Sequence, residues 1–341
     1  MKKQTPCWLV LTFFLTTLLG SCRKEDEKNT DPLPATSHTA WVLNEGNFGW
    51  GNASLGRVSL DDSLYIPGVF ERVNQRPLGD VLQSGLVHQG ELYLVLNNSG
   101  TIEVLDPIEA KLLRTLRIGE SPRYMSPIAH SVDAWVTDLF GGFVRKINLQ
   151  TGEVKETLRI PGWNEKIYAL PSQLQVVMNL SSHALYFIDD LNPGSLDSFK
   201  VPDSQMRDMV LSEDRSSLYV CIQTEGQKGV LLQISDRGQA NEIALLDFIP
   251  RRFVIRGDDA FCLGSEWIYR IQLSTGQVES WVPVKEGMVP YGLSIDTRGN
   301  LWLMDAVDYV QQGKVLVYNK QAQQIAIFNV GAIPREILFV D

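Results

Sequence analysis

The sequence predicts an all-β protein, a seven-bladed β-propeller closed by its C-terminal strand, from its strand patterning, its internal repeat and its complementary ends. From residue 40 onward, short runs rich in Val, Ile, Leu and Tyr are separated by Gly, Asn, Asp and Pro, without a sustained helical period. One register recurs, with units starting at residues 79, 122, 165, 206, 251, 290 and 334. These starts lie 39 to 45 residues apart, and four strands at that period are typical of a propeller blade.

The first complete unit illustrates the expected order of strands. An innermost strand begins with Gly79-Asp80-Val81-Leu82, and the turn at 97–100 separates the second strand from the third. The four strands are expected at 79–82, 92–96, 101–105 and 111–118. The later units begin at Pro122-Arg123-Tyr124, Glu165-Lys166-Ile167, Met206-Arg207-Asp208, Arg251-Arg252-Phe253 and Pro290-Tyr291-Gly292.

The two ends of the repeat region complement each other. The first unit opens at Trp41-Val42-Leu43 with the pattern of a second strand and lacks an innermost one. The C-terminal run Glu336–Val340 repeats only the innermost strand and can supply it. Closing the ring in this way pairs both ends and leaves no exposed sheet edge. A β-sandwich would not repeat at this period, and a β-helix would repeat about every 20 residues.

The N-terminal residues 1–21 read as a secretory signal. Lys2 and Lys3 precede an apolar run from Trp8 to Leu19, and small residues follow it. The run is shorter than the about 20 residues that a membrane-spanning helix needs. Leu19-Gly20-Ser21-Cys22 resembles the bacterial lipobox, which implies that Cys22 is acylated and becomes the first residue of the mature chain. A plain signal peptide with a coincidental cysteine is the alternative.

Residues 22–39 form the predicted tether between the acylated cysteine and the propeller at 40–341. The segment is polar and contains Pro, so it cannot bury apolar surface. The cluster Arg23-Lys24-Glu25-Asp26-Glu27 resembles the surface-export signal of some outer-membrane lipoproteins, and the alternative is a solvated run of charges. We therefore expect a lipid-anchored protein of the outer membrane, exposed at the cell surface.

The composition favours a binding module over a metalloenzyme. The 341 residues include 44% hydrophobic ones, which is enough for a globular core, and carry a formal charge of −9. An acidic surface repels phosphate backbones, so nucleic acid is not an expected partner. With only four His and four Cys, and without a phosphate-binding loop, nucleophile elbow or paired metal-ligand motif, we expect no cofactor, no metal and no catalytic residue.

The candidate ligand site lies on one face of the predicted propeller. Connections between second and third strands, and between an outer strand and the next inner strand, open on the same face. Aromatic rings next to amides and guanidiniums suit a flat, partly apolar ligand with polar edges. The predicted ligand-binding residues are Asn44, Glu45, Asn47, Phe48, Trp50, Asn52, Arg76, Asn97, Arg123, Tyr124, Asp138, Phe140 and Trp163. About half of the aromatic residues on this face are expected to pack between blades instead.

Several of these segments carry a family resemblance. The stretches 42–49, 76–80, 95–100, 121–124, 137–139 and 160–163 resemble the YncE-like propellers found as surface lipoproteins. The resemblance covers about residues 40–341 and is strongest over the first three blades. Relatives of the BtuG type capture cobalamin at the cell surface and sit over a TonB-dependent transporter. The resemblance therefore implies a corrinoid or similar nutrient as ligand and such a transporter as partner.

Two other classes of function stay open from the sequence. The first is a propeller enzyme of the lactonase or lyase kind, in which Glu45, Asp138 and Asp305 would gather around a metal. The second is a protein-interaction scaffold or adhesin. His88 and His130 are expected in turns on the opposite face, and Cys221 and Cys262 are expected to be free buried thiols.

Overall fold

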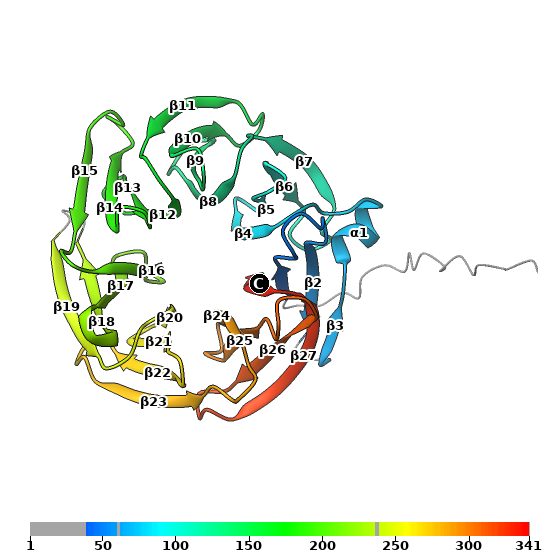
Figure 1. Ribbon diagram of the computed structural model, residues 1–341. Helices are drawn as coiled ribbons and strands as arrows, with labels where there is room; N and C mark the ends of the chain where they lie inside the picture. The colour runs from blue at the N-terminus through cyan, green and yellow to red at the C-terminus, as the bar shows by residue number, and fades with distance from the viewer. Residues whose placement is uncertain (1–38, 60–61, 236–238, 341) are drawn as a thin grey trace, which may run out of the picture. The chain divides into compact units, whose positions relative to one another are not determined.

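The computed structural model describes residues 39–59, 62–235 and 239–340. Within them the chain forms seven four-stranded antiparallel sheets arranged as the blades of a ring (Figure 1). The predicted leader, the acylation site and all but the last residue of the predicted tether lie outside the described residues. The all-β fold and the number of blades are confirmed. Within the described residues, no helix is both long and apolar enough to cross a membrane.

Each of the first four blades runs from an innermost strand at the axis of the ring to an outermost strand at its rim. Blade 1 consists, in that order, of β28 (Pro334–Val340), β1 (Thr39–Asn44), β2 (Ser54–Ser59) and β3 (Leu64–Ile66). Blade 2 consists of β4 (Leu82–His88), β5 (Glu91–Leu96), β6 (Thr101–Leu105) and β7 (Leu112–Arg117). Blade 3 consists of β8 (Pro122–Pro127), β9 (Asp133–Asp138), β10 (Phe143–Asn148) and β11 (Val154–Arg159). Blade 4 consists of β12 (Asn164–Ala169), β13 (Leu174–Asn179), β14 (Ala184–Asp189) and β15 (Leu196–Lys200).

The remaining blades follow the same order. Blade 5 consists of β16 (Gln205–Leu211), β17 (Leu218–Thr224), β18 (Lys228–Ile234) and β19 (Ala240–Leu246). Blade 6 consists of β20 (Arg252–Arg256), β21 (Asp259–Leu263), β22 (Trp267–Gln272) and β23 (Val278–Pro283). Blade 7 consists of β24 (Pro290–Ile295), β25 (Leu301–Asp305), β26 (Gln312–Tyr318) and β27 (Gln324–Ala332). The helix α1 (Val69–Asn74) and the 3-10 turn η1 (Glu225–Gln227) lie in connections.

The ring closes through the last strand of the chain, as the sequence predicts. β28 pairs antiparallel with β1, with Val42 opposite Ile337, and becomes the innermost strand of blade 1. In Figure 1 the red C-terminal strand accordingly lies beside the blue first blade. Closure supplies hydrogen-bond partners for both strands, which would otherwise be open edges.

Buried tryptophans on second strands stabilise three of the blades. Trp41 in β1, Trp135 in β9 and Trp302 in β25 are fully buried. Each indole N–H has a partner: the carbonyl of Pro107 at 2.8 Å, and carboxylate oxygens of Asp190 at 2.7 Å and Asp296 at 3.1 Å. Because a buried indole N–H without a partner is costly, these bonds fix the position of each ring. For Trp41 and Trp135 the partner belongs to the following blade, so the bond also joins two blades.

The structure differs from the predicted elements between blades 1 and 2. The sequence predicts no helix, but α1 forms one and a half turns there and buries Val69 and Phe70 in the core between the two blades. The innermost strand of blade 2 begins at Leu82, not at Gly79, because Gly79 and Val81 have positive φ values of 145° and 61°. Such values turn the chain and cannot belong to a regular strand.

Candidate functional site

The connections between strands divide over two faces of the ring. Because every blade is antiparallel, the connections from second to third strands and from outer to next inner strands all leave on one side. We call this side the loop face. It includes the segments 45–53, 139–142, 160–163 and 306–311. Every residue predicted to bind the ligand lies on one of these connections or at a strand end beside one. His88 and His130 lie on the opposite face, as expected.

The segment 45–53 is held in place by hydrogen bonds to two neighbouring blades. The amide oxygen of Asn52 accepts from the backbone N–H of Asn47 at 2.7 Å, and its NH₂ donates to the Asn47 side-chain oxygen at 3.1 Å. The N–H of Gly49 donates to Asp80 at 2.9 Å, and the Asn47 side chain donates to the carbonyl of Tyr309. These contacts fix the loop between blades 2 and 7.

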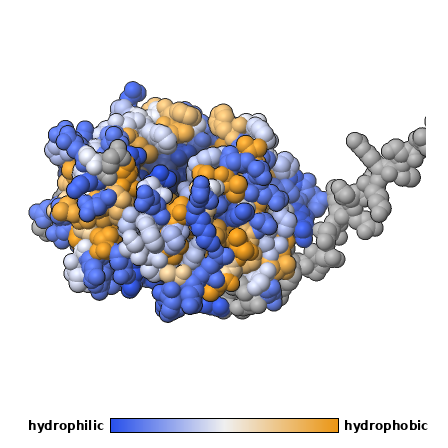
Figure 2. All heavy atoms as spheres, turned by 60° about the horizontal axis from the view of Figure 1, so that its bottom comes forward, coloured by the Kyte–Doolittle hydropathy of each residue, from blue (hydrophilic) through white to orange (hydrophobic). Residues whose placement is uncertain are grey.

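Aromatic side chains are exposed on the loop face. Phe48 is 69% exposed, Trp50 66% and Phe140 76%, and Trp163 and Tyr309 are partly exposed. They come from four different connections, in blades 1, 3 and 7 and between blades 3 and 4. Figure 2 shows one side of the molecule, on which hydrophobic side chains lie in patches among hydrophilic ones. Five large aromatic side chains with exposed surface thus lie on connections of the loop face.

An ion-pair network lies inside the loop face, at the start of the inner strands. The guanidinium of Arg335 in β28 lies 2.7 Å from the Glu45 carboxylate and 3.4 Å from that of Glu165. It also donates to the hydroxyl oxygens of Tyr124 and Tyr291, both at 3.2 Å. The Tyr291 hydroxyl donates to Glu45 at 2.8 Å, and burial raises the pKa of Tyr291 to about 12. The network therefore joins blades 1, 3, 4 and 7.

Glu165 continues this network into blades 3 and 4. Arg123 donates to both of its carboxylate oxygens, at 2.8 and 2.9 Å, and the Trp163 indole N–H donates at 2.6 Å. Burial opposes ionisation of this carboxyl, but Arg123 and Arg335 outweigh burial and hold the pKa of Glu165 below its usual value. The guanidinium of Arg123 also lies 5.4 Å from the centre of the Trp163 ring. The buried Arg123–Glu165 ion pair thereby fixes the orientation of the Trp163 ring.

Four of the predicted ligand-binding residues have buried side chains with partners inside the fold. Asn44 donates to the Ser54 side chain and carbonyl. Asn97 donates to the carbonyl of Pro122 at 3.0 Å, and Arg123 pairs with Glu165. Asp138 accepts from the backbone N–H groups of residues 121, 140 and 141 and so shapes the turn that carries Phe140. These side chains position the loop face, and their direct contact with a ligand stays a prediction.

Two further predicted residues are committed to ion pairs. Arg76 lies 2.7 Å from Glu103 and 4.8 Å from the ring centre of Phe70, and so anchors α1 to blade 2. Glu45 belongs to the Arg335 network. Tyr124 is half-buried and faces the centre of the ring. The predicted residues with exposed side chains are therefore Phe48, Trp50, Asn52, Phe140 and Trp163.

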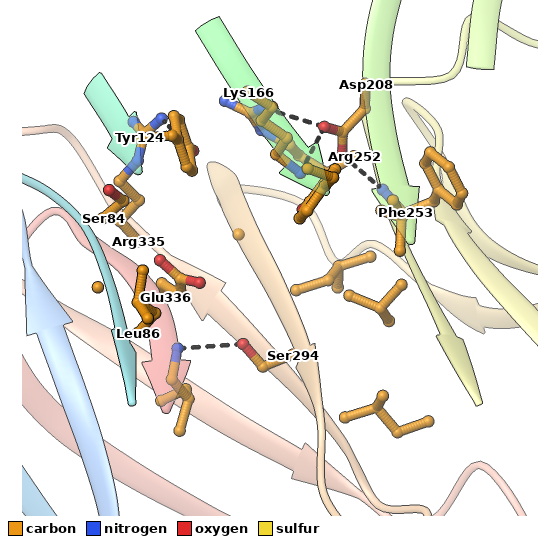
Figure 3. Close-up of a pocket in the computed structure, with 18 of the residues that line it drawn as sticks. Ser84, Leu86, Tyr124, Lys166, Asp208, Arg252, Phe253, Ser294, Arg335 and Glu336 are labelled. Carbon is orange, nitrogen blue, oxygen red and sulfur yellow. Dashed lines mark hydrogen bonds and ion pairs between the residues drawn. The ribbon is translucent and has the colours of Figure 1, made fainter. Parts of the chain in front are cut away.

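A cavity of about 340 Å³ occupies the centre of the ring, and all seven inner strands line it. Figure 3 shows Lys166, Asp208 and Arg252 together on one side of it, with Arg335 and Tyr124 on another. Lys166 lies 2.7 Å from Asp208 and donates to the carbonyl of Met209 at 3.1 Å. Arg252 lies 3.6 Å from the same carboxylate. The cavity therefore contains closely spaced charges of both signs.

The central charges are functional candidates that sequence patterns alone did not identify. Lys166, Asp208, Arg252, Arg335 and Glu336 stand in the recurring strand starts, where they mark the register of the repeat. The sequence nevertheless contains a pattern that points to them. Charged pairs recur at the beginning of the inner strands, which are the strands nearest the axis of a propeller. The repeat of such pairs could have indicated a charged centre.

The three carboxylates considered for a metal-dependent lactonase or lyase, Glu45, Asp138 and Asp305, each have partners of their own. Asp305 accepts from the backbone N–H groups of Val289 and Val307, whereas Asp138 and Glu45 have separate partners of their own. Among the described residues, no group of three His, Cys, Asp or Glu side chains could hold a metal ion. Cys221 and Cys262 are free and buried, as expected, and burial raises the pKa of both thiols.

Comparisons with known proteins support the fold. No protein family and no curated protein matches the sequence. Among solved structures, a putative 6-phosphogluconolactonase from Bacteroides fragilis is 15% identical with a TM-score of 0.68, covering 91% of this chain and 100% of its own. A quinoprotein alcohol dehydrogenase-like protein from Bacteroides thetaiotaomicron is 12% identical with a TM-score of 0.68. The match covers 88% of this chain and 78% of that protein. The virginiamycin B lyase from Staphylococcus aureus is 14% identical with a TM-score of 0.57. The match covers 72% of this chain and 83% of the lyase. At these identities the similarity establishes a shared propeller fold, on which different functions occur.

Proposed function

We propose that this protein is a lipid-anchored surface protein of the outer membrane that binds a small-molecule nutrient on its loop face. The proposed ligand is cobalamin or another corrinoid, which the protein hands to a TonB-dependent transporter. The observation that carries the proposal is the set of exposed aromatic side chains Phe48, Trp50, Phe140, Trp163 and Tyr309 on ordered connections of one face.

The chemistry of this face suits a broad, flat ligand. A corrinoid presents a wide ring fringed with amide groups, so its receptor needs apolar planes beside hydrogen-bonding groups. Phe48 and Trp50 offer such planes, and the amides of Asn47 and Asn52 lie in the same loop. Because hydrogen bonds already fix the loop, little conformational entropy would be lost on binding. Because a corrinoid is large and nearly neutral, the negative net charge of the protein does not repel it.

The predicted anchor fits a role in capture. If Cys22 is acylated, the chain from Cys22 to Thr39 spans at most roughly 60 Å when fully extended. That length lets the propeller reach over a neighbouring transporter in the same membrane. Acyl chains hold the protein to the membrane, while the loop face stays available for the ligand.

Calorimetric titration of the purified protein with cyanocobalamin tests the proposal. We expect saturable binding of one cyanocobalamin, weaker or no binding of haem, and no binding of neutral oligosaccharides. Cobinamide, which lacks the lower nucleotide, shows whether the corrin ring itself is recognised. A corrinoid titration without heat or spectral change would overturn the assignment of the ligand. Equal affinity for haem and cyanocobalamin would also overturn it. The loop face would then recognise any flat apolar molecule rather than a corrinoid.

A further inference from the structure

The central cavity is lined differently at its two ends. Each inner strand begins at the loop face, so residue order along the strand follows depth in the cavity. Near the loop face the lining is charged, with Lys166, Asp208, Arg252, Arg335 and Glu336. Deeper in, the lining is apolar and half-buried, with Leu86, Val210, Val254, Ile295 and Phe339. The cavity thus has a polar end and an apolar end.

The cations at the polar end differ in how closely carboxylates pair with them. Arg335 has carboxylates at 2.7 and 3.4 Å, and Lys166 has Asp208 at 2.7 Å. The one ion pair of Arg252 among the described residues is with the same Asp208, at 3.6 Å. Its side chain is 29% exposed to the cavity. A guanidinium carries five N–H donors, so Arg252 retains donors for a ligand.

Glu336 is the other carboxyl that lines the cavity. Glu336 has no ion-pair partner within the described part of the chain. Burial raises its pKa, although Lys166, Arg335 and Arg252 oppose the shift. Tyr124, Tyr168 and Asp208 are the other titratable groups that line the cavity. Among the three cations at the polar end, Arg252 has the longest ion pair and the most exposed side chain, so it is the cation most available to a ligand.

We propose that the central cavity binds a small monocarboxylate with a short apolar body. The carboxylate pairs with the Arg252 guanidinium, and the body lies against the apolar lining deeper in the cavity. Arginine suits this role because its planar donors match the two oxygens of a carboxylate. A volume of about 340 Å³ is at the lower end of the range for ligand pockets, so a small metabolite fits and a corrinoid does not. This site is separate from the aromatic loop face.

Titration of the full-length protein with straight-chain monocarboxylates from acetate to octanoate tests the site. Each methylene that enters the apolar end should tighten binding by about fourfold until the cavity is filled. The corresponding primary amides should bind at least tenfold more weakly, and inorganic phosphate should not compete. Affinity that is independent of chain length would overturn the proposal, as would equal binding of acids and amides. Competition by phosphate would also overturn it by showing a general anion site.

Variants locate the binding in the cavity. Arg252→Gln should weaken carboxylate binding roughly 10- to 100-fold, because a charge-assisted pair is lost. Arg256→Gln is the matched control, since Arg256 is in the same strand but pairs with Glu213 on the opposite face, and it should bind normally. If Arg252→Gln does not fold, Val254→Phe serves instead. It fills the apolar end and should exclude octanoate more than acetate. Unchanged octanoate binding in Val254→Phe would place the ligand elsewhere.

The pH dependence of binding provides an independent readout. In the wild type, affinity should fall as the pH rises through the raised pKa of Glu336, because the ionised carboxylate repels the ligand and compensates Arg252. In Glu336→Gln the affinity should stay high across the same range. The same pH profile in the wild type and in Glu336→Gln would show that the ligand carboxylate does not lie near Glu336, and would overturn the proposed site.

Discussion

Arg335 donates to the carboxylate of Glu45 at 2.7 Å, although 290 positions separate the two residues in the chain. Arg335 stands on the closing strand β28 and Glu45 directly follows β1, the strand with which β28 pairs. The same guanidinium reaches Glu165 in blade 4 and the hydroxyls of Tyr124 and Tyr291. One buried guanidinium on the closing strand therefore connects blade 1 to blades 3, 4 and 7.

Removing this guanidinium should destabilise the protein strongly. Arg335→Gln leaves the Glu45 carboxylate without an ion-pair partner among the described residues, whereas Glu165 keeps Arg123, and breaking a buried pair in this way costs about 3–5 kcal/mol. The free energy of unfolding in urea measures the effect. Arg270→Gln is the matched control, because Arg270 pairs with Asp259 and Glu279 at an exposed position, where a pair contributes less than about 1 kcal/mol. Equal losses in the two variants would contradict the role given to Arg335.

Acid should remove the stabilisation that Glu165 provides. Its pKa is lowered in the folded protein, so the unfolded chain takes up a proton at Glu165 first as the pH falls. The contribution is complete above the ordinary glutamate pKa and is lost as the pH falls toward the lowered one. Urea unfolding at a series of pH values should show a shallower acid loss for Glu165→Gln than for the wild type. Identical slopes would show that Glu165 is not the group responsible.

The exposed aromatics should carry the binding of the proposed corrinoid. Trp50→Ala and Phe140→Ala should each weaken cyanocobalamin binding by about 1–3 kcal/mol, as at an interface hot spot, without lowering the melting temperature. Calorimetry of the variants gives both values. Val154→Ala, in the outer strand β11, and His130→Ala, on the opposite face, are the controls. If the controls lose affinity and the aromatic variants do not, the ligand binds on another face.

Deleting the residues from Glu336 onward should unfold or aggregate the protein. Without this segment, β1 becomes an open edge and the apolar side chains that pack against β28 are exposed. Circular dichroism during heating measures the outcome. A truncated chain that melts at the wild-type temperature would show that blade 1 is stable with three strands.

Cys22→Ala should release the protein from the membrane fraction while the propeller stays folded. In the lipobox interpretation, acyl chains at this residue are the whole anchor. Fractionation of cells followed by a high-salt wash checks where the variant goes. A variant that stays with the membranes after this wash would mean that Cys22 does not carry the anchor.

The sequence predicts the blades and their closure well because the information is repeated. Seven copies of one register identify the inner strands to within about three residues. The same approach does not predict the helix α1, because its six residues contain less than two helical turns and show no clear period. Its stability comes from tertiary packing of Val69 and Phe70, which a local pattern does not reveal.

The candidate sites are less predictable because strand irregularities decide where side chains point. The inner strands β8, β12, β16 and β24 each have a register shift near the loop face. A β-bulge reverses the alternation of side chains beyond it. Lys166 and Asp208 stand next to such shifts, so simple alternation could not assign them to the cavity. Asn97 and Asp138 look like ligand groups in the sequence but satisfy backbone partners.

The pairing of β28 with β1 also determines when the molecule can finish folding. The innermost strand of the first blade is synthesised after all the other blades, so β1 must wait for β28. Contacts of such long sequence separation form slowly because the intervening chain must first be brought together. Blades 2 to 7 contain only consecutive strands and can assemble earlier. A chain that stops before β28 should therefore remain exposed to proteases, so ring closure distinguishes chains that contain this strand from those that lack it.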